Sequence, residues 1–359
     1  MAVEEDGLDV DSESILDRAL SALYPSRDLR WHYRSRHHSL IAFSNRQFYG
    51  DRLFVFPSPA DRAVDLGVSL VPVVNGQYKA SINPEEADQV VRTVANVIRA
   101  TPDRSIGVVA VNQPQKELLL ERFDRLFAED EKLEAYRAKW SGTLEEFFVK
   151  NLENVQGDER DVIVVSTVYG PDCPGGQVFQ RFGPINSNVG HRRLNVLFTR
   201  AKERVVLVSS LTPEQIILNE SSKPGVRALK AYLEYARSGR LEQGVTGLGG
   251  HDSPFEAEVS EVIEGLGYEV EPQVGVAGYR IDLAVRSRTS RDHFVVGIEC
   301  DGATYHSAKS ARDRDRLRQE ILERLGWNLY RIWSTDWFLN REREVGRLKR
   351  HLDEVMAAH

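Results

Sequence analysis

The sequence predicts an α/β fold in which a large parallel sheet with helices on both faces is followed by a smaller α/β domain. Apolar, β-branched runs that suit buried strands occupy residues 105–111, 161–168 and 204–209. They alternate with amphipathic helical patterns at residues 85–99 and 116–128, and this alternation favours a doubly wound parallel sheet. A stretch with five glycines, residues 239–250, separates this part from a second series of strand and helix patterns.

The second series reads as helix, three strands, helix, strand and helix. The expected ranges are 254–266, 268–273, 280–285, 293–301, 308–325, 328–332 and 340–356. Between the two parts, residues 213–218 and 226–236 have helical apolar spacing. We therefore expect four segments. They are an acidic lead-in with a short helix (1–28), the parallel-sheet domain (29–218), a connector helix with the glycine-rich linker (219–250) and the smaller domain (251–359).

Composition and charge exclude several classes of protein. The sequence has no charged-then-apolar leader and no apolar run long enough to span a bilayer, so we expect a cytoplasmic protein with no membrane partner. The formal net charge of -7 argues against a protein that coats nucleic acid nonspecifically. Basic stretches at residues 26–52 and 191–204 leave two readings open, phosphate contacts or ordinary solvated surface. Two cysteines are too few for a disulfide framework or a cysteine-based zinc site, so we expect carboxylates to bind any metal.

Acidic side chains cluster at the end of the expected strand 293–301. Glu299 and Asp301 share one face of that strand, about 7 Å apart, and Cys300 points away. With His306 just past the following turn, they form a candidate site for a hard cation and a proton. The alternative is a solvated edge-strand face. Like charges side by side after an apolar run are costly without a cation, which favours the metal site.

Four stretches of the first part resemble motifs of superfamily 1 helicases of the nonsense-decay type. They are residues 31–37 (WHYRSRH), 114–116 (PQK), 153–163 (ENVQGDERDVI) and 193–202 (RLNVLFTRAK). The resemblance implies a RecA-like domain, the second of the helicase motor. It further implies that Arg34 and Arg200 stabilise the transferring phosphoryl group, that Glu159 contacts the nucleotide sugar, and that Gln156 couples nucleotide to nucleic acid. The alternative for the two arginines is pairing with surface carboxylates.

The sequence lacks the counterparts of the first motor domain. It has no Gly-x-x-x-x-Gly-Lys-Ser/Thr loop to cradle phosphates, and no acidic metal-binding motif of that domain. We therefore expect the chain alone neither to bind ATP tightly nor to hydrolyse it. ATP becomes a cofactor only with a first RecA-like domain, supplied by the same full-length chain or in trans. Of these two arrangements we favour the first, in which the chain is a fragment of a larger helicase.

The second part resembles nuclease domains related to the very-short-patch repair endonuclease, a branch of the PD-(D/E)xK superfamily. The matching stretches are 253–256 (SPFE), 280–285 (RIDLAV), 299–306 (ECDGATYH), 312–315 (RDRD), 325–327 (LGW) and 330–334 (YRIWS). The resemblance implies a restriction-endonuclease-like domain with catalytic residues Glu256, Asp282, Glu299, Asp301, His306 and Asp315. Of these, Asp282, Glu299 and Asp301 are the expected ligands of Mg²⁺ or Mn²⁺. Asp301 stands where the superfamily usually has lysine, so the general base stays undefined.

These features lead to two hypotheses. The first is a metal-dependent DNA endonuclease attached to an incomplete helicase motor, hydrolysing phosphodiester bonds in DNA that the motor delivers or opens. Repair, restriction or defence is the setting that fold analogy suggests. The second is a noncatalytic module that binds nucleic acid, couples to an ATPase and uses a nuclease-like clamp. RNA in place of DNA stays open under both.

Overall fold

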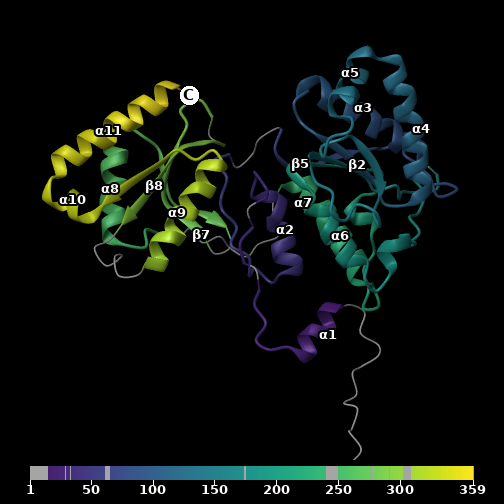
Figure 1. Ribbon diagram of the computed structural model, residues 1–359, viewed down its shortest axis with the longest axis horizontal. Coiled ribbons are helices and arrows are strands. Elements are labelled where there is room, and N and C mark those ends of the chain that lie inside the picture. The colour runs from purple at the N-terminus through teal and green to yellow at the C-terminus, as the bar shows by residue number, and fades with distance from the viewer. Residues whose placement is uncertain are drawn as a thin grey trace, which may run out of the picture.

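The computed structural model describes residues 15–28, 30–32, 34–60, 65–173, 175–239, 250–276, 279–290, 292–301 and 309–358. They form two α/β bodies that lie side by side, the first built on a five-stranded sheet and the second on a four-stranded sheet (Figure 1). The predicted fold class is confirmed. The start of the lead-in (1–14), most of the glycine-rich linker (240–249) and His306 lie outside the described residues. Among those that are described, no helix is long and apolar enough to cross a membrane.

The first sheet is entirely parallel, with strand order β1-β5-β4-β2-β3. Its strands are β1 (Gly67–Pro72), β2 (Ile106–Ala110), β3 (Phe148–Asn151), β4 (Arg160–Ser166) and β5 (Ala201–Ser209). Every residue of β2 is buried, as expected for a continuous apolar run with helices on both sides.

Six helices cover this sheet. One face packs against α3 (Pro84–Ala100), α4 (Gln113–Glu129) and α5 (Glu131–Trp140), and the other against α2 (Ser39–Phe48), α6 (Gly190–Phe198) and α7 (Pro224–Ser238). The remaining helical elements of this body are α1 (Ile15–Ala22), η1 (Gly183–Asn186) and η2 (Pro213–Gln215). The helix predicted over 213–218 is wrong beyond its first turn. Thr212 and Gln215 close a capping box around that turn, and fully buried Ile216 then continues with extended backbone into the core.

The second body follows the predicted order of elements except for one short helix, Ser334–Leu339, which was not predicted and lies before the last helix. It comprises α8 (Pro254–Gly265), β6 (Val270–Val276), β7 (Tyr279–Arg286), β8 (Phe294–Asp301), α9 (Lys309–Arg324), β9 (Leu329–Trp333), α10 (Ser334–Leu339) and α11 (Arg341–Ala358). Strands β6, β7 and β8 pair antiparallel, and β9 pairs parallel to β8. Helices α8 and α11 cover one face of this sheet, and α9 covers the other.

Residues 54–60 of the first body, the junction segment, complete the core on the α9 face. The Phe56 ring lies 4.9 Å from the Tyr279 ring, centroid to centroid, inside a buried cluster that also holds Phe294 and Trp327. Backbone carbonyls of the segment accept hydrogen bonds from the second body: Trp327 Nε1 donates to Pro57 O at 2.8 Å, and Phe294 N donates to Pro59 O at 2.7 Å. The two bodies are therefore joined by packing as well as by the chain.

Candidate functional site

Asp282 and Glu299 lie next to each other on neighbouring strands of the second sheet. Leu283 of β7 pairs with Ile298 of β8, so Asp282 and Glu299 are the next residues along this antiparallel ladder. Asp282 Oδ2 accepts a hydrogen bond of 2.7 Å from the backbone N–H of Cys300. The side chain of Cys300 packs on the α8 and α11 face.

The strand carrying Asp282 departs from strict alternation at that residue. Tyr279 and Ile281 belong to the cluster on the α9 face, whereas Leu283 and Val285 belong to the cluster on the α8 face. Opposite this point, Gln273 of β6 has a positive φ of 54°, which a residue with a side chain rarely adopts. At this irregularity Gln273 and Asp282 lie opposite each other, and both interact with Glu256 in the first turn of α8.

Glu256 reaches the same place from the first turn of α8. Ser253 caps the helix and accepts from Glu256 N, while Ser253 Oγ donates to Glu256 Oε1 at 2.9 Å. Gln273 Nε2 donates to Glu256 Oε2 at 2.8 Å. Glu256 is only 6% exposed, so the cap and Gln273 hold its carboxylate in one orientation.

Burial and the charges of neighbouring acids raise the pKa values of Asp282 and Glu299. The pKa of Asp282 is raised to about 7, first by burial and then by the charges of Glu299, Glu256 and Asp301; the Cys300 N–H opposes this shift. Burial also raises the pKa of Glu299, against the hydrogen bond from Tyr279 and the charges of Arg318 and Arg331. A carboxylate that accepts one hydrogen bond and faces other acids is a site for a cation or a proton.

The other side of Glu299 is basic. Tyr279 Oη donates to Glu299 Oε1 at 2.6 Å, and Arg331 Nε forms an ion pair of 2.9 Å with Asp301 Oδ2. A cavity of about 20 Å³, room for roughly one water, lies between Glu299, Asp301, Arg318 and Arg331. An anionic group beside Glu299 would therefore meet guanidinium groups.

The predicted residues of the second body thus fall into three groups. Glu256, Asp282 and Glu299 converge, Asp301 is engaged by Arg331, and Asp315 lies on α9 with its side chain outside the described part. The oxygen-only donor set of the convergent acids suits a hard divalent cation. Within the described residues, no group of three or more histidine, cysteine and acidic side chains is arranged to hold a metal ion.

Sequence reasoning missed three side chains that shape this site, namely Gln273, Tyr279 and Arg331. The only sequence signal for Gln273 is a polar residue within a strand pattern directly after Pro272. Tyr279 and Arg331 reach Glu299 and Asp301 through strand register, which no local pattern reveals.

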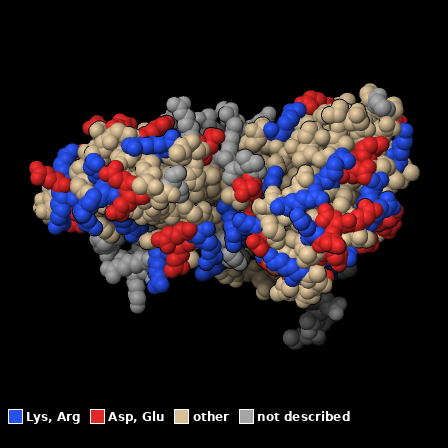
Figure 2. Space-filling view, turned by 90° about the horizontal axis from the view of Figure 1, so that it is seen from above, with Lys and Arg blue, Asp and Glu red and all other residues tan. Residues whose placement is uncertain are grey.

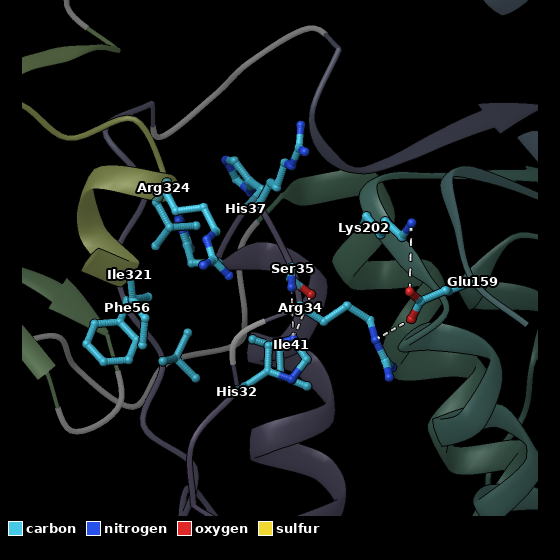
Figure 3. Close-up of a pocket in the computed structure, with 14 residues that line it drawn as sticks. His32, Arg34, Ser35, His37, Ile41, Phe56, Glu159, Lys202, Ile321 and Arg324 are labelled. Carbon is cyan, nitrogen blue, oxygen red and sulfur yellow. Dashed lines mark hydrogen bonds and ion pairs between the residues drawn. The ribbon is translucent and has the colours of Figure 1, made fainter. Parts of the chain in front are cut away.

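Three of the four predicted nucleotide residues of the first body, Arg34, Glu159 and Arg200, lie close together. Arg34 Nε pairs with Glu159 Oε2 at 2.7 Å (Figure 3). The pKa of the Arg200 guanidinium is lowered by burial and then by Arg34, so the two arginines lie close enough to repel each other, while Glu159 opposes this shift. Gln156 is exposed in the same loop as Glu159, next to Gly157, whose φ of 90° makes the turn.

Two family models match the two bodies. The model of the AAA domain family, AAA_12, matches residues 12–212, which is more than half of the chain. The model of the family REase_MTES_1575 matches residues 255–352. The first match covers the parallel sheet, and the second covers the smaller domain from α8 into α11.

Two curated relatives are named as uncharacterized ATP-dependent helicases. The MG140 homolog of Mycoplasma pneumoniae is 29% identical over 329 residues, covering 87% of this chain and 28% of the relative. MG140 of Mycoplasma genitalium is 29% identical over 356 residues, covering 90% of this chain and 29% of the relative. The chain therefore spans less than a third of the length of these relatives.

A solved structure, the C-terminal domain of a possible DNA helicase from Lactobacillus plantarum, shares 16% identity. The match covers 53% of this chain and 96% of that structure, with a TM-score of 0.29. The family matches carry the assignment. The chain belongs to the AAA domain family AAA_12 and continues into a restriction-endonuclease-like domain.

Proposed function

We propose that this chain is a metal-dependent nuclease domain attached to the second RecA-like half of a superfamily 1 helicase motor. The observation that carries the proposal is the convergence of Asp282, Glu299 and Glu256, with the pKa of Asp282 raised to about 7. Gathering buried acids is costly unless a cation or a proton neutralises them. Acids in such environments are typical of catalytic sites.

In this proposal Asp282 and Glu299 hold a Mg²⁺ or Mn²⁺ ion, with the backbone carbonyl of Cys300 as a further oxygen donor. When bound, such an ion polarises the scissile phosphate and lowers the pKa of an attacking water. Asp301 stays a proposed third ligand, although its partner in the structure is Arg331. His306 and Asp315 keep their proposed catalytic roles.

The other groups around the acids act on geometry and on the anionic substrate. Gln273 and the helix cap hold Glu256, and Tyr279 fixes one oxygen of Glu299. Arg318 and Arg331 lie beside Glu299, where their charges would attract a phosphodiester. The site therefore pairs acids for a cation with guanidinium groups for a phosphate.

The first body supplies the motor half in this proposal. Arg34, Arg200, Glu159 and Gln156 would meet a nucleotide held mainly by a first RecA-like domain. Two curated relatives named as ATP-dependent helicases, each more than three times as long as the matched part, support this assignment. The chain by itself is expected to show only background ATPase activity, with or without DNA.

One observation favours a second candidate function, a nuclease-like clamp that binds nucleic acid without cutting it. Asp301 replaces the lysine usual in the superfamily and is neutralised by Arg331. A clamp would need the basic side of the site and could dispense with the cation. Like the proposed nuclease, the clamp would bind nucleic acid. Unlike the nuclease, it would not hydrolyse the phosphodiester bond.

A cleavage assay separates the two candidates. The chain is incubated with supercoiled, linear and single-stranded DNA, and with RNA, in Mg²⁺ or Mn²⁺. We expect metal-dependent cleavage that falls by about 100-fold or more in Asp282→Asn, because removing a metal-bound charge removes transition-state stabilisation. The control Asp292→Asn makes the same change at an exposed turn and should retain activity. Absence of cleavage on every substrate, or full activity of Asp282→Asn, supports the clamp instead.

A further inference from the structure

A cavity of about 410 Å³ lies where the two bodies meet (Figure 3). Its volume is in the range of small-molecule sites. The first body contributes the stretch around Arg34 and Arg36, together with Lys202, and the junction segment contributes Phe56. The opposite wall is the end of α9, with Ile321 and Arg324. A ligand here would touch both bodies at once.

The charged side chains of this cavity are mainly cationic. Arg34, Arg36, Lys202 and Arg324 line it, and Glu159 is its one acidic lining residue among those described. Figure 2 shows basic side chains at the surface where the two bodies meet. An anion is therefore the ligand that the lining favours.

Most of these charges have partners that hold them in place. Arg36 pairs with buried Glu203 at 2.5 Å, and Glu203 is shared with Arg104. Lys202 pairs with Glu145 at 2.6 Å. Within the described residues Arg324 is exposed and has no ion-pair partner, so a charge on the second body faces the cavity without compensation.

The histidines of the wall add no positive charge near neutral pH. Burial lowers the pKa of His32 to about 4 and that of His38 to about 3, with the neighbouring charges of Arg34 and His37 acting in the same direction. His37 donates from Nε2 to Ala60 O at 2.9 Å and thereby ties the wall to the junction segment. The basic character of the cavity thus comes from guanidinium and ammonium groups, which stay charged over the whole physiological range.

Helix α9 also connects this cavity to the candidate nuclease site. Ile321 and Arg324 face the interdomain cavity, while Arg318 and Leu322 face the small cavity beside Glu299. One helix therefore forms a wall of both. A ligand that moved Arg324 would act on the element that places Arg318 next to Glu299.

We propose that the interdomain cavity binds phosphate groups, and that Arg324 is the contribution of the second body to this site. Guanidinium groups match phosphate oxygens in charge and geometry. The ligand class rests on the proposed function, in which both a nucleotide and a nucleic-acid strand carry such groups. The new element is that the nuclease-like domain takes part in binding next to the motor residues Arg34 and Glu159.

The test measures binding by the full chain rather than cleavage, with a fluorescent ATP analogue in one arm and a labelled single-stranded oligonucleotide in the other. Arg324→Gln removes the charge at the cavity. Arg316→Gln removes the same charge from the same helix at a side chain that is 85% exposed and pairs with Glu320, outside the cavity. We expect Arg324→Gln to weaken binding in one arm by about tenfold, the scale of a charge-assisted hydrogen bond, and Arg324→Lys to recover part of it. Arg316→Gln should change it by less than about twofold.

The arm that responds identifies the source of the phosphate. If Arg324→Gln weakens only the binding of the ATP analogue, the natural ligand is a nucleotide. If it weakens the binding of the oligonucleotide and lowers the salt dependence of that binding by about one phosphate contact, the natural ligand is a nucleic-acid strand. Equal affinities of Arg324→Gln and the unaltered chain in both arms, or no binding of either probe by the unaltered chain, would overturn the proposal. Metal-dependent cleavage is scored separately, so a nuclease without this site and a phosphate site without nuclease activity give different results.

Discussion

Glu86, which is buried in the first body, and Asp282, which is partly buried in the second, both have pKa values raised to about 7, with desolvation as the first cause. Around Glu86 every further influence lowers the pKa, because donors surround it: Val168 N at 2.6 Å, Ser166 Oγ at 2.7 Å and Ser210 N at 2.9 Å. Around Asp282 a single N–H opposes burial, and three other acids add to it. Burial alone therefore does not identify a functional site. The difference is that the neighbours of Glu86 lower its pKa, whereas the acidic neighbours of Asp282 raise it further.

The two environments lead to different roles. Glu86 joins the residues that follow β4 and β5 at the carboxyl edge of the first sheet, where Val168 and Ser210 would otherwise bury unpaired N–H groups. Asp282 accepts one backbone N–H and faces three other acids, whose charges raise its pKa further. We infer that Glu86 stabilises the fold, whereas Asp282 costs stability until a cation binds.

The largest change in stability is expected from a substitution that removes the hydrogen bonds of Glu86. Glu86→Ala should lower the free energy of unfolding by about 3 kcal/mol, because several buried donors lose their acceptor at once. Denaturant unfolding measures this, with Glu85→Ala as the control at the exposed neighbouring position in the same helical turn. A loss below about 1 kcal/mol for Glu86→Ala would mean that Glu86 is not the hub of this edge.

At Asp282 we expect the opposite result: when no divalent ion is present, replacing this acid should raise the stability of the protein. When the pKa of an acid is raised in the folded state, the folded protein loses stability as the pH rises from the ordinary pKa of the acid up to the raised one, here about 7. Asp282→Asn lacks this loss, so its Tm should exceed that of the unaltered chain by about 3 °C at pH 8 and by less at pH 5.5. Thermal unfolding in a chelator at both pH values checks this. A lower Tm at pH 8 would place Asp282 in the same class as Glu86.

A smaller effect is expected at Tyr279, which donates to Glu299. Tyr279→Phe removes a hydrogen bond that lowers the pKa of Glu299, so the pKa of this acid rises further and a proton competes better with a cation for it. Affinity for Mn²⁺ should fall by about threefold at pH 7 and by less at higher pH, where protons compete less with the cation for Glu299. Calorimetric titration gives both values, and Tyr330→Phe, on the α8 face, serves as the control. A loss independent of pH would argue for a packing role instead.

The fold could be predicted because its signals are local. The apolar runs of the parallel sheet and the helix–strand order of the second body are visible in the sequence, and so are the acids that end or follow a strand pattern. Gln273, Tyr279 and Arg331 act through strand register and through a break in alternation at Asp282, which depend on pairing between distant segments.

The junction segment escaped prediction for a related reason. Residues 54–60 contain two prolines and read as a loop, yet Phe56 packs between residues more than 200 positions later in the chain. The cavity beside it joins residues that share no local pattern, such as Arg34 and Arg324. Contacts of this kind follow from how the two bodies dock, which the pattern within either body does not determine.

The central claim is that the acids around Asp282 form a site for a divalent cation, and its most direct test is the thermal stability of the full chain at pH 8 as Mn²⁺ is added. A ligand that binds only the folded state raises Tm with its concentration. The unaltered chain and Asp292→Asn should gain several degrees, whereas Asp282→Asn, which starts higher, should gain little. Equal gains for all three proteins, or no gain for the unaltered chain, would contradict the claim.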